Sequence, residues 1–202
     1  MAATKKRYVL TDETKTIIHE GKEIILHRIR ALQTFNMDEF HSVTYLDEGG
    51  WIEKESNLSQ TGHAWIGKDA MVFGNAVVSG NAFIYGSAQI YGRAKIKGHA
   101  RVYGRAQVYE NAVIDGNARV YGRATVHGRA LVDGNAQVSD EANVYDDAHI
   151  TGNTEISENA TVCEKATATD YSKAYGHSKI CGTFCLSGSF RAGANMTMGR
   201  RK

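Results

Sequence analysis

The chain has 202 residues, a net charge of +2, 21 glycines, three cysteines and no proline. This near-neutral balance disfavours a general nucleic-acid binder, which is basic throughout. No apolar run is long enough to span a membrane, and Met1 does not begin a secretory signal pattern. We therefore expect a cytoplasmic protein with no membrane association.

Residues 1–60 lack the repeat that dominates the rest of the chain. Their first half indicates short strands around a turn at Glu20 and Gly21, and the second strand is open to a few helical residues at its end. A stack of repeated coils exposes apolar interior and strand edges unless its first coil is covered. We predict that residues 1–60 form an N-terminal β cap.

Residues 61–191 follow a six-residue repeat, as in NAFIYG and SAQIYG, without an insertion. Every sixth residue from Ile66 to Leu186 is Val, Ile, Leu or, at Ala168 and Ala174, Ala. A small residue, usually Ala, stands two positions earlier, so both side chains point to the same side of an extended strand. Gly and Asn then suit a left-handed corner. Short strands joined by repeated corners predict an all-β solenoid, and the lack of proline suits parallel pairing.

This repeat resembles that of the hexapeptide-repeat proteins. Their fold implies a single-stranded left-handed parallel β-helix of triangular section, here with about seven coils. One departure is visible, because Gly follows the aliphatic residue directly only in Ile66-Gly67, whereas most units place it one residue later. The segment from Gly49 to Ser59 resembles the entry sequence of bacterial and phage hexapeptide-repeat proteins of the YdcK type, a group labelled as transferases by fold analogy.

Residues 192–202 lose the sequence pattern, end in Gly-Arg-Arg-Lys, and are predicted to form a basic C-terminal tail. Cys163 and Cys181 are 18 residues apart, a spacing that stacks them on neighbouring strands if three repeats make one coil. For a cytosolic protein we expect both to remain free thiols.

With three repeats per coil, residues 18 apart share an outward column. Two adjacent columns form what we call the tyrosine–arginine face, the surface on which we expect a ligand or partner to bind. Its candidate binding residues are Trp65, Phe83, Tyr85, Arg101, Tyr103, Arg119 and Tyr121.

Two simpler interpretations compete for the same columns. Stacked tyrosines stabilise a parallel ladder by themselves. Flat aromatic faces with arginine are also typical of interfaces, and the family resemblance implies a homotrimer or homodimer.

Charge is banded along the repeat: residues 93–129 carry a local charge of +6, residues 130–170 a local charge of −8, and residues 171–202 a local charge of +6. Adjacent bands of opposite sign suit docking to a complementary protein. The alternative is neutral drift in solvated repeats.

Catalysis is weakly indicated. The eight histidines lie in different columns without zinc-ligand spacing, so we expect no metal and no cofactor. If the protein is an enzyme, His127 is the first candidate base and His99 the second.

We therefore expect a rigid, non-catalytic binding or scaffold module that self-associates and holds a protein partner or an anionic ligand. The resemblance to phage proteins extends this expectation to a factor that inhibits or sequesters a host component. The alternative is a transferase that uses an acyl or nucleotide-linked donor at a site between subunits.

Overall fold

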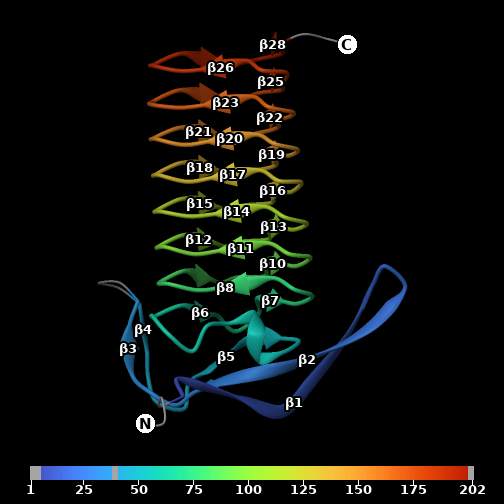
Figure 1. The fold of residues 1–202 in the computed structure, drawn as a ribbon, viewed down its shortest axis with the longest axis vertical. Helices are drawn as coiled ribbons and strands as arrows, with labels where there is room; N and C mark the ends of the chain where they lie inside the picture. Colours follow the sequence, from blue (N-terminus) through green and yellow to red (C-terminus); the bar gives the residue numbers. More distant parts are fainter. Residues whose placement is uncertain (1–5, 38–40, 200–202) are drawn as a thin grey trace.

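The chain winds into a left-handed parallel β-solenoid with a β hairpin across its lower end (Figure 1). A computed structural model describes residues 6–37 and 41–199. The solenoid has three faces, made of an 11-stranded, an 8-stranded and a 7-stranded sheet. We call these the hairpin face, the tyrosine–arginine face and the mixed face. The winding makes about eight turns, close to the predicted seven.

From β6 onward, every strand of the solenoid that the structure describes is two residues long. The hairpin face contains β1 (Tyr8–His19), β2 (Lys22–Ala31), β5 (Glu48–Ile52), β7 (Met71–Val72), β10 (Gln89–Ile90), β13 (Gln107–Val108), β16 (Thr125–Val126), β19 (Asn143–Val144), β22 (Thr161–Val162), β25 (Lys179–Ile180) and β28 (Thr197–Met198). The tyrosine–arginine face contains β6 (Trp65–Ile66), β9 (Phe83–Ile84), β12 (Arg101–Val102), β15 (Arg119–Val120), β18 (Gln137–Val138), β21 (Glu155–Ile156), β24 (Lys173–Ala174) and β27 (Arg191–Ala192). The mixed face contains β8 (Val77–Val78), β11 (Lys95–Ile96), β14 (Val113–Ile114), β17 (Leu131–Val132), β20 (His149–Ile150), β23 (Thr167–Ala168) and β26 (Cys185–Leu186).

The core is the column predicted from the repeat. Ala and aliphatic residues such as Ala112 and Ile114 are fully buried along the solenoid. Residues 18 apart pair in parallel, as Val113 does with Leu131, which confirms three repeats per coil. Where Thr154 replaces Ala, its hydroxyl donates to the carbonyl of Thr151 at 2.7 Å, so the inward polar group has a partner.

The corners need a left-handed backbone, with φ between +62° and +76° at the solenoid glycines from Gly62 to Gly188 that adopt it. Six corners carry an acidic residue instead, with φ between +57° and +62°: Glu110, Asp140, Asp146, Glu158, Glu164 and Asp170. The carboxylate of such a corner can accept a hydrogen bond from the backbone N–H of the corner one coil later. Glu110 Oε2 accepts the N–H of Gly128 in this way at 2.8 Å.

The cap is built from β1 and β2, which form an antiparallel hairpin with a turn at Glu20 and Gly21, as predicted. β2 remains a strand to Ala31, so it contains no helical extension, and it joins the solenoid by antiparallel pairing with β5. The short strands β3 (Phe35–Asn36) and β4 (Ser42–Val43) form a second hairpin, and a 3-10 turn, η1, covers Glu55–Asn57.

Tyr8 fixes the cap to the first coil. Its hydroxyl lies 2.9 Å from the carbonyl oxygen of Glu55 and 2.6 Å from that of Leu58, both of which can accept its hydrogen bond. Burial raises the pKa of Tyr8, and the nearby Glu55 adds to the rise. Residues 1–5 and 38–40 of the predicted cap lie outside the described residues.

Two expectations need correction at the far end of the chain. Cys163 and Cys181 form a disulfide rather than two free thiols, because stacking brings their Cα atoms to 4.8 Å, within bonding range. The solenoid also continues beyond residue 191, where a tail was predicted, because β27 and β28 add two further strands and Met198 packs against the core. Residues 200–202 of that tail lie outside the described residues.

Candidate functional site

Three tyrosines of the tyrosine–arginine face stack directly on one another. The ring centroids of Tyr85 and Tyr103 are 4.6 Å apart with planes 5° from parallel, and those of Tyr103 and Tyr121 are 4.9 Å apart with planes 3° from parallel. The faces of these rings therefore contact each other. A ligand meets ring edges and hydroxyl groups along the ladder, rather than open stacking platforms.

Arg101 and Arg119 lie beside this ladder in the neighbouring column, paired in register on β12 and β15. Burial raises the pKa of Tyr103 and Tyr121 adds to the rise, whereas Arg119 and Arg101 oppose it. Within the described residues, Arg119 is exposed and has no ion pair. The guanidinium of Arg119 is therefore accessible for a bidentate contact to a phosphate or a carboxylate.

The lower end of the predicted surface is covered by the cap. Trp65 is only 4% exposed and packs edge-on against Phe35 of β3, with ring centroids 5.9 Å apart. Phe83 is half-buried beside His41, with ring centroids 5.5 Å apart. Trp65 is thus a packing residue between cap and solenoid, and it cannot reach a ligand on the face. A cavity of about 380 Å³ remains beside Trp65 and Phe83, under the β3–β4 hairpin.

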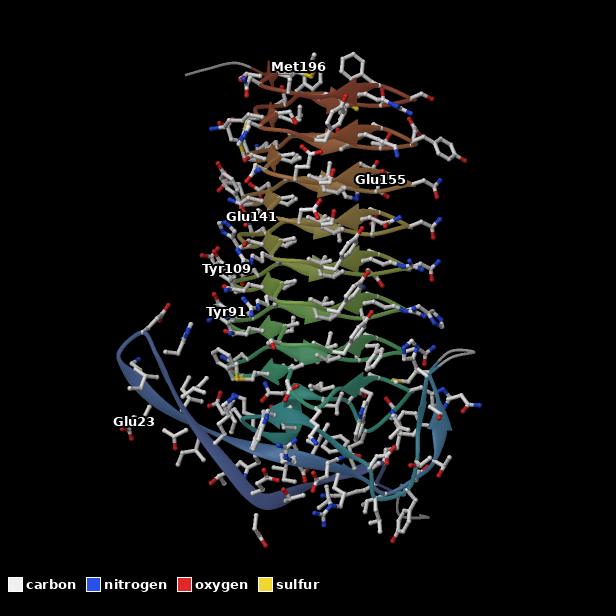
Figure 2. All side chains as sticks on the ribbon, turned by 180° about the vertical axis from the view of Figure 1, so that it is seen from behind. Glu23, Tyr91, Tyr109, Glu141, Glu155 and Met196 are labelled. Atoms are coloured by element: carbon white, nitrogen blue, oxygen red, sulfur yellow. A yellow bond between two sulfur atoms is a disulfide. The ribbon has the colours of Figure 1, made fainter. Side chains whose placement is uncertain are left out.

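The two candidate bases lie apart from this face and from each other. His127 is a rung of a second ladder on the hairpin face, stacked between Tyr109 at 4.8 Å and Tyr145 at 5.2 Å. Figure 2 shows Tyr91 and Tyr109 one above the other in the same ladder. His99 lies at another corner, with Nε2 3.2 Å from the side-chain nitrogen of Asn81.

The structure brings together a pair that the column analysis did not single out. His149 Nε2 lies 3.3 Å from Asp133 Oδ2 on the mixed face, diagonally across neighbouring coils. The other carboxylate oxygen of Asp133 is buried without a hydrogen-bond partner. A spacing of 16 residues, combined with the 18-residue coil, is the sequence signal that identifies such diagonal neighbours.

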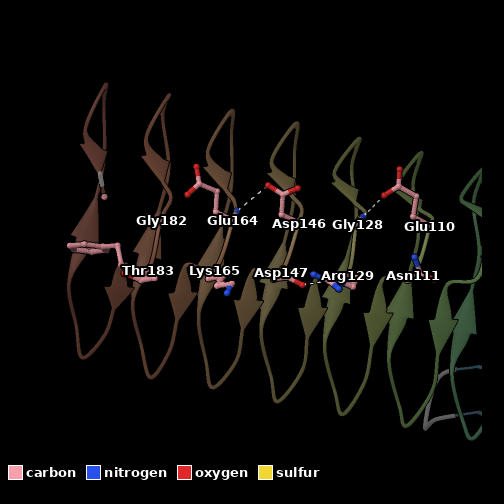
Figure 3. A pocket seen from close by; sticks show the side chains of 12 residues that line it. Glu110, Asn111, Gly128, Arg129, Asp146, Asp147, Glu164, Lys165, Gly182 and Thr183 are labelled. Carbon is pink, nitrogen blue, oxygen red and sulfur yellow. Dashed lines mark hydrogen bonds and ion pairs between the residues drawn. The ribbon is translucent and has the colours of Figure 1, made fainter. Parts of the chain in front are cut away.

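A groove of about 1100 Å³ runs along the corner between the hairpin face and the mixed face (Figure 3). Two rows of corner side chains form its walls, and Gly128 and Gly182 leave gaps in one row. Arg129 is held by a two-pronged ion pair with Asp147, at 2.7 and 2.8 Å. The charged residues that line the groove are Glu110, Arg129, Asp146, Asp147, Glu164 and Lys165.

Carboxylates outnumber cations in this groove, so it disfavours a polyanionic ligand such as a phosphate-bearing donor. Across the described part of the chain, no cluster of three His, Cys, Asp or Glu side chains is placed to hold a metal ion. No helix in that part is long and apolar enough to cross a membrane.

Comparison with known proteins gives limited but specific information. No family model matches the chain. A protein named "Uncharacterized acetyltransferase YdcK" from Escherichia coli (strain K12) is 33% identical over 79 residues, which cover 37% of this chain and 23% of that protein. The match thus spans less than a quarter of the relative's length. Together with the parallel solenoid, this match fits a protein of the hexapeptide-repeat, left-handed β-helix type.

Proposed function

We propose that this protein is a rigid, non-catalytic binding module that holds an anionic ligand, or an acidic patch of a protein partner, on its tyrosine–arginine face. The observation that carries the proposal is the in-register pair Arg101 and Arg119 beside the stacked tyrosines. Bidentate contacts from the exposed guanidinium of Arg119, with Arg101 in register beside it, would hold a phosphate or a carboxylate. Tyr85, Tyr103 and Tyr121 would add hydroxyl hydrogen bonds along the same line.

The rigidity of the scaffold suits this role. Each outward side chain is positioned by a strand whose backbone bonds to the coils on both sides, so little ordering is required when a ligand binds. We extend the proposal to a homotrimer or homodimer in the cytoplasm and, from the resemblance to phage proteins, to sequestration of a host component.

The test is calorimetric binding of inorganic pyrophosphate and of a panel of mononucleotides and dinucleotides. The double variant Arg101→Ala/Arg119→Ala should weaken binding by at least about tenfold, a loss of ~1.4 kcal/mol. Arg123→Ala is the matched control, because Arg123 belongs to the same basic band but pairs with Glu141 at a corner, 3.3 Å away. Equal affinities for the double variant and the control would refute the proposed surface.

A second candidate function is a transferase with an acyl or nucleotide-linked donor. It is favoured by the name of the E. coli relative and by the His149–Asp133 pair, in which the carboxylate can orient the imidazole as a general base. This function predicts that acetyl-CoA raises the melting temperature. An unchanged melting temperature at millimolar acetyl-CoA, together with no His149-dependent acetyl transfer, would exclude it for that donor.

A further inference from the structure

The last coil differs from all others at its inward positions. Elsewhere in the solenoid the first inward residue of each repeat is small, such as Ala160, Ala166 or Ser172. In the last coil this position holds Phe184, Phe190 and Met196. Phe190 is 46% exposed and Met196 is 41% exposed, and Figure 2 shows Met196 at the extreme end of the molecule.

The same coil has unpaired strand edges within the described residues. β26, β27 and β28 are each the last strand of their sheets. One coil below, the amides of Thr167, Lys173 and Lys179 donate upward to the carbonyls of the last coil at 2.8 to 2.9 Å. By the same register, three amides point outward along the solenoid axis with no described acceptor: those of Cys185, Arg191 and Thr197.

The sequence that forms this end is basic. From residue 171 to residue 202 the sequence contains six Lys or Arg and no Asp or Glu. Lys173 pairs with Glu155 below it, whereas Lys179 and Arg191 are exposed and have no ion pair among the described residues. Two copies placed end to end would therefore bring like charges together, which disfavours a second copy as the occupant.

We propose that this end of the solenoid, formed by β26, β27, β28 and the side chains of Phe184, Phe190 and Met196, docks an acidic polypeptide segment that adds extended strands to the three sheets. Exposed strand edges bind extended chains through main-chain hydrogen bonds. Here Phe190 and Met196 supply the apolar contact, and Lys179 and Arg191 select an acidic sequence. The proposal does not depend on Arg101 and Arg119, the residues that carry the proposed function.

The protein contains suitable probes in its own repeats. A synthetic peptide of residues 141–158 is one full coil with five carboxylates and no Lys or Arg, whereas a peptide of residues 93–110 is one full coil with five Lys or Arg and one carboxylate. Both have the repeat pattern needed for strand addition, so they differ mainly in charge. We expect the acidic peptide to bind at least about tenfold more tightly. It should also slow hydrogen exchange at the amides of Cys185, Arg191 and Thr197.

Two variants separate the contributions. Lys179→Glu/Arg191→Glu alters exposed side chains and should reverse the preference between the two peptides. Phe190→Ser/Met196→Ser should weaken both peptides, and the charge variant remains decisive if this one disorders the last coil. Arg123→Ala serves as the control that leaves peptide binding unchanged, because Arg123 pairs with Glu141 away from the last coil.

Three outcomes would overturn the proposal. The first is no slowing of exchange at the three amides with either peptide. The second is equal affinity for the acidic and basic peptides, which would remove the selection by charge. The third is a dimer in native mass spectrometry whose three amides are already protected without peptide, because the end would then be a contact between two copies.

Discussion

Replacing Gly104 tests how the corners of the solenoid are stabilised. Gly104 has φ +73°, and a Cβ added to it would lie 2.9 Å from both the backbone N and the backbone O of Gly122 in the next coil. Alanine would introduce this contact without a compensating hydrogen bond. Aspartate would introduce the same contact, but its carboxylate would be placed to accept the N–H of Gly122. Glu158 accepts the N–H of Gly176 in this way at 2.9 Å.

The magnitude follows from three contributions. A left-handed alanine costs roughly 1–2 kcal/mol, and a close backbone contact adds about 1–3 kcal/mol. Reduced freedom of the unfolded chain offsets about 0.4–1 kcal/mol. We therefore expect Gly104→Ala to lower the free energy of unfolding by ~2–4 kcal/mol. Gly104→Asp should be about 1–2 kcal/mol less damaging, because Asp tolerates the left-handed region and gains a charged acceptor.

The assay is urea unfolding followed by circular dichroism, at pH 7 and at pH 3. Gly104→Asp should be more stable than Gly104→Ala at pH 7, although aspartate is the larger side chain. This advantage should shrink at pH 3, where the new carboxyl becomes protonated. Gly104→Asn serves as the uncharged control and should lie between the other two. An alanine variant as stable as the aspartate variant at pH 7 would refute this account of the corners.

Three further predictions concern the core, a ladder and an ion pair. Ile114 is fully buried, so Ile114→Val should lower the free energy of unfolding by about 1 kcal/mol and Ile114→Ala by about 3–4 kcal/mol. Chemical denaturation measures both values, and equal costs would contradict close packing of the core. Burial, with Tyr109, Glu110 and Glu20 adding, raises the pKa of Tyr91 to about 12. Its contribution to stability should be complete below pH ~10 and be lost as the pH rises toward 12, and the late tyrosinate absorbance should decrease by the contribution of one tyrosine in Tyr91→Phe. The pKa of Asp115 is lowered, mainly by the hydrogen bond from Lys97, which lies 2.8 Å away, and next by the hydrogen bond from the N–H of Gly116. Its contribution should be present above pH ~3.9 and be lost as the pH falls through the lowered value, and Lys97→Met should raise that pKa in an NMR titration.

The repeat was sufficient to predict the solenoid because its physical cause is local. Each unit pairs a small and a branched residue two positions apart, and the structure buries both, as at Ala118 and Val120. The cap was less predictable. The long β1–β2 hairpin depends on pairing between β2 and β5, two segments separated by a further hairpin, and no local pattern encodes that contact.

The candidate surface shows the same limit. Column analysis placed Tyr85, Tyr103 and Tyr121 in one stack, and the structure confirms that stack. It also grouped Trp65 with them, because Trp65 occupies an outward position of the repeat. Only the tertiary contact with Phe35 buries this ring, and the periodicity contains no information about which outward residues the cap covers.

The charge bands have a structural cause that the sequence pattern did not reveal. Five of the nine acidic residues between 130 and 170 occupy left-handed corners, where most other coils have glycine. Several of these carboxylates bind a corner N–H of the next coil, as Asp140 does with Glu158 at 3.0 Å and Asp170 with Gly188 at 2.9 Å. The acidic band therefore helps to hold consecutive coils together, and no docking partner is needed to explain it. Beyond residue 170, Lys173 also pairs with Glu155 of the coil below, but Lys179 and Arg191 have no ion pair among the described residues. That end, and not the acidic band, is therefore the better candidate for a partner of opposite charge.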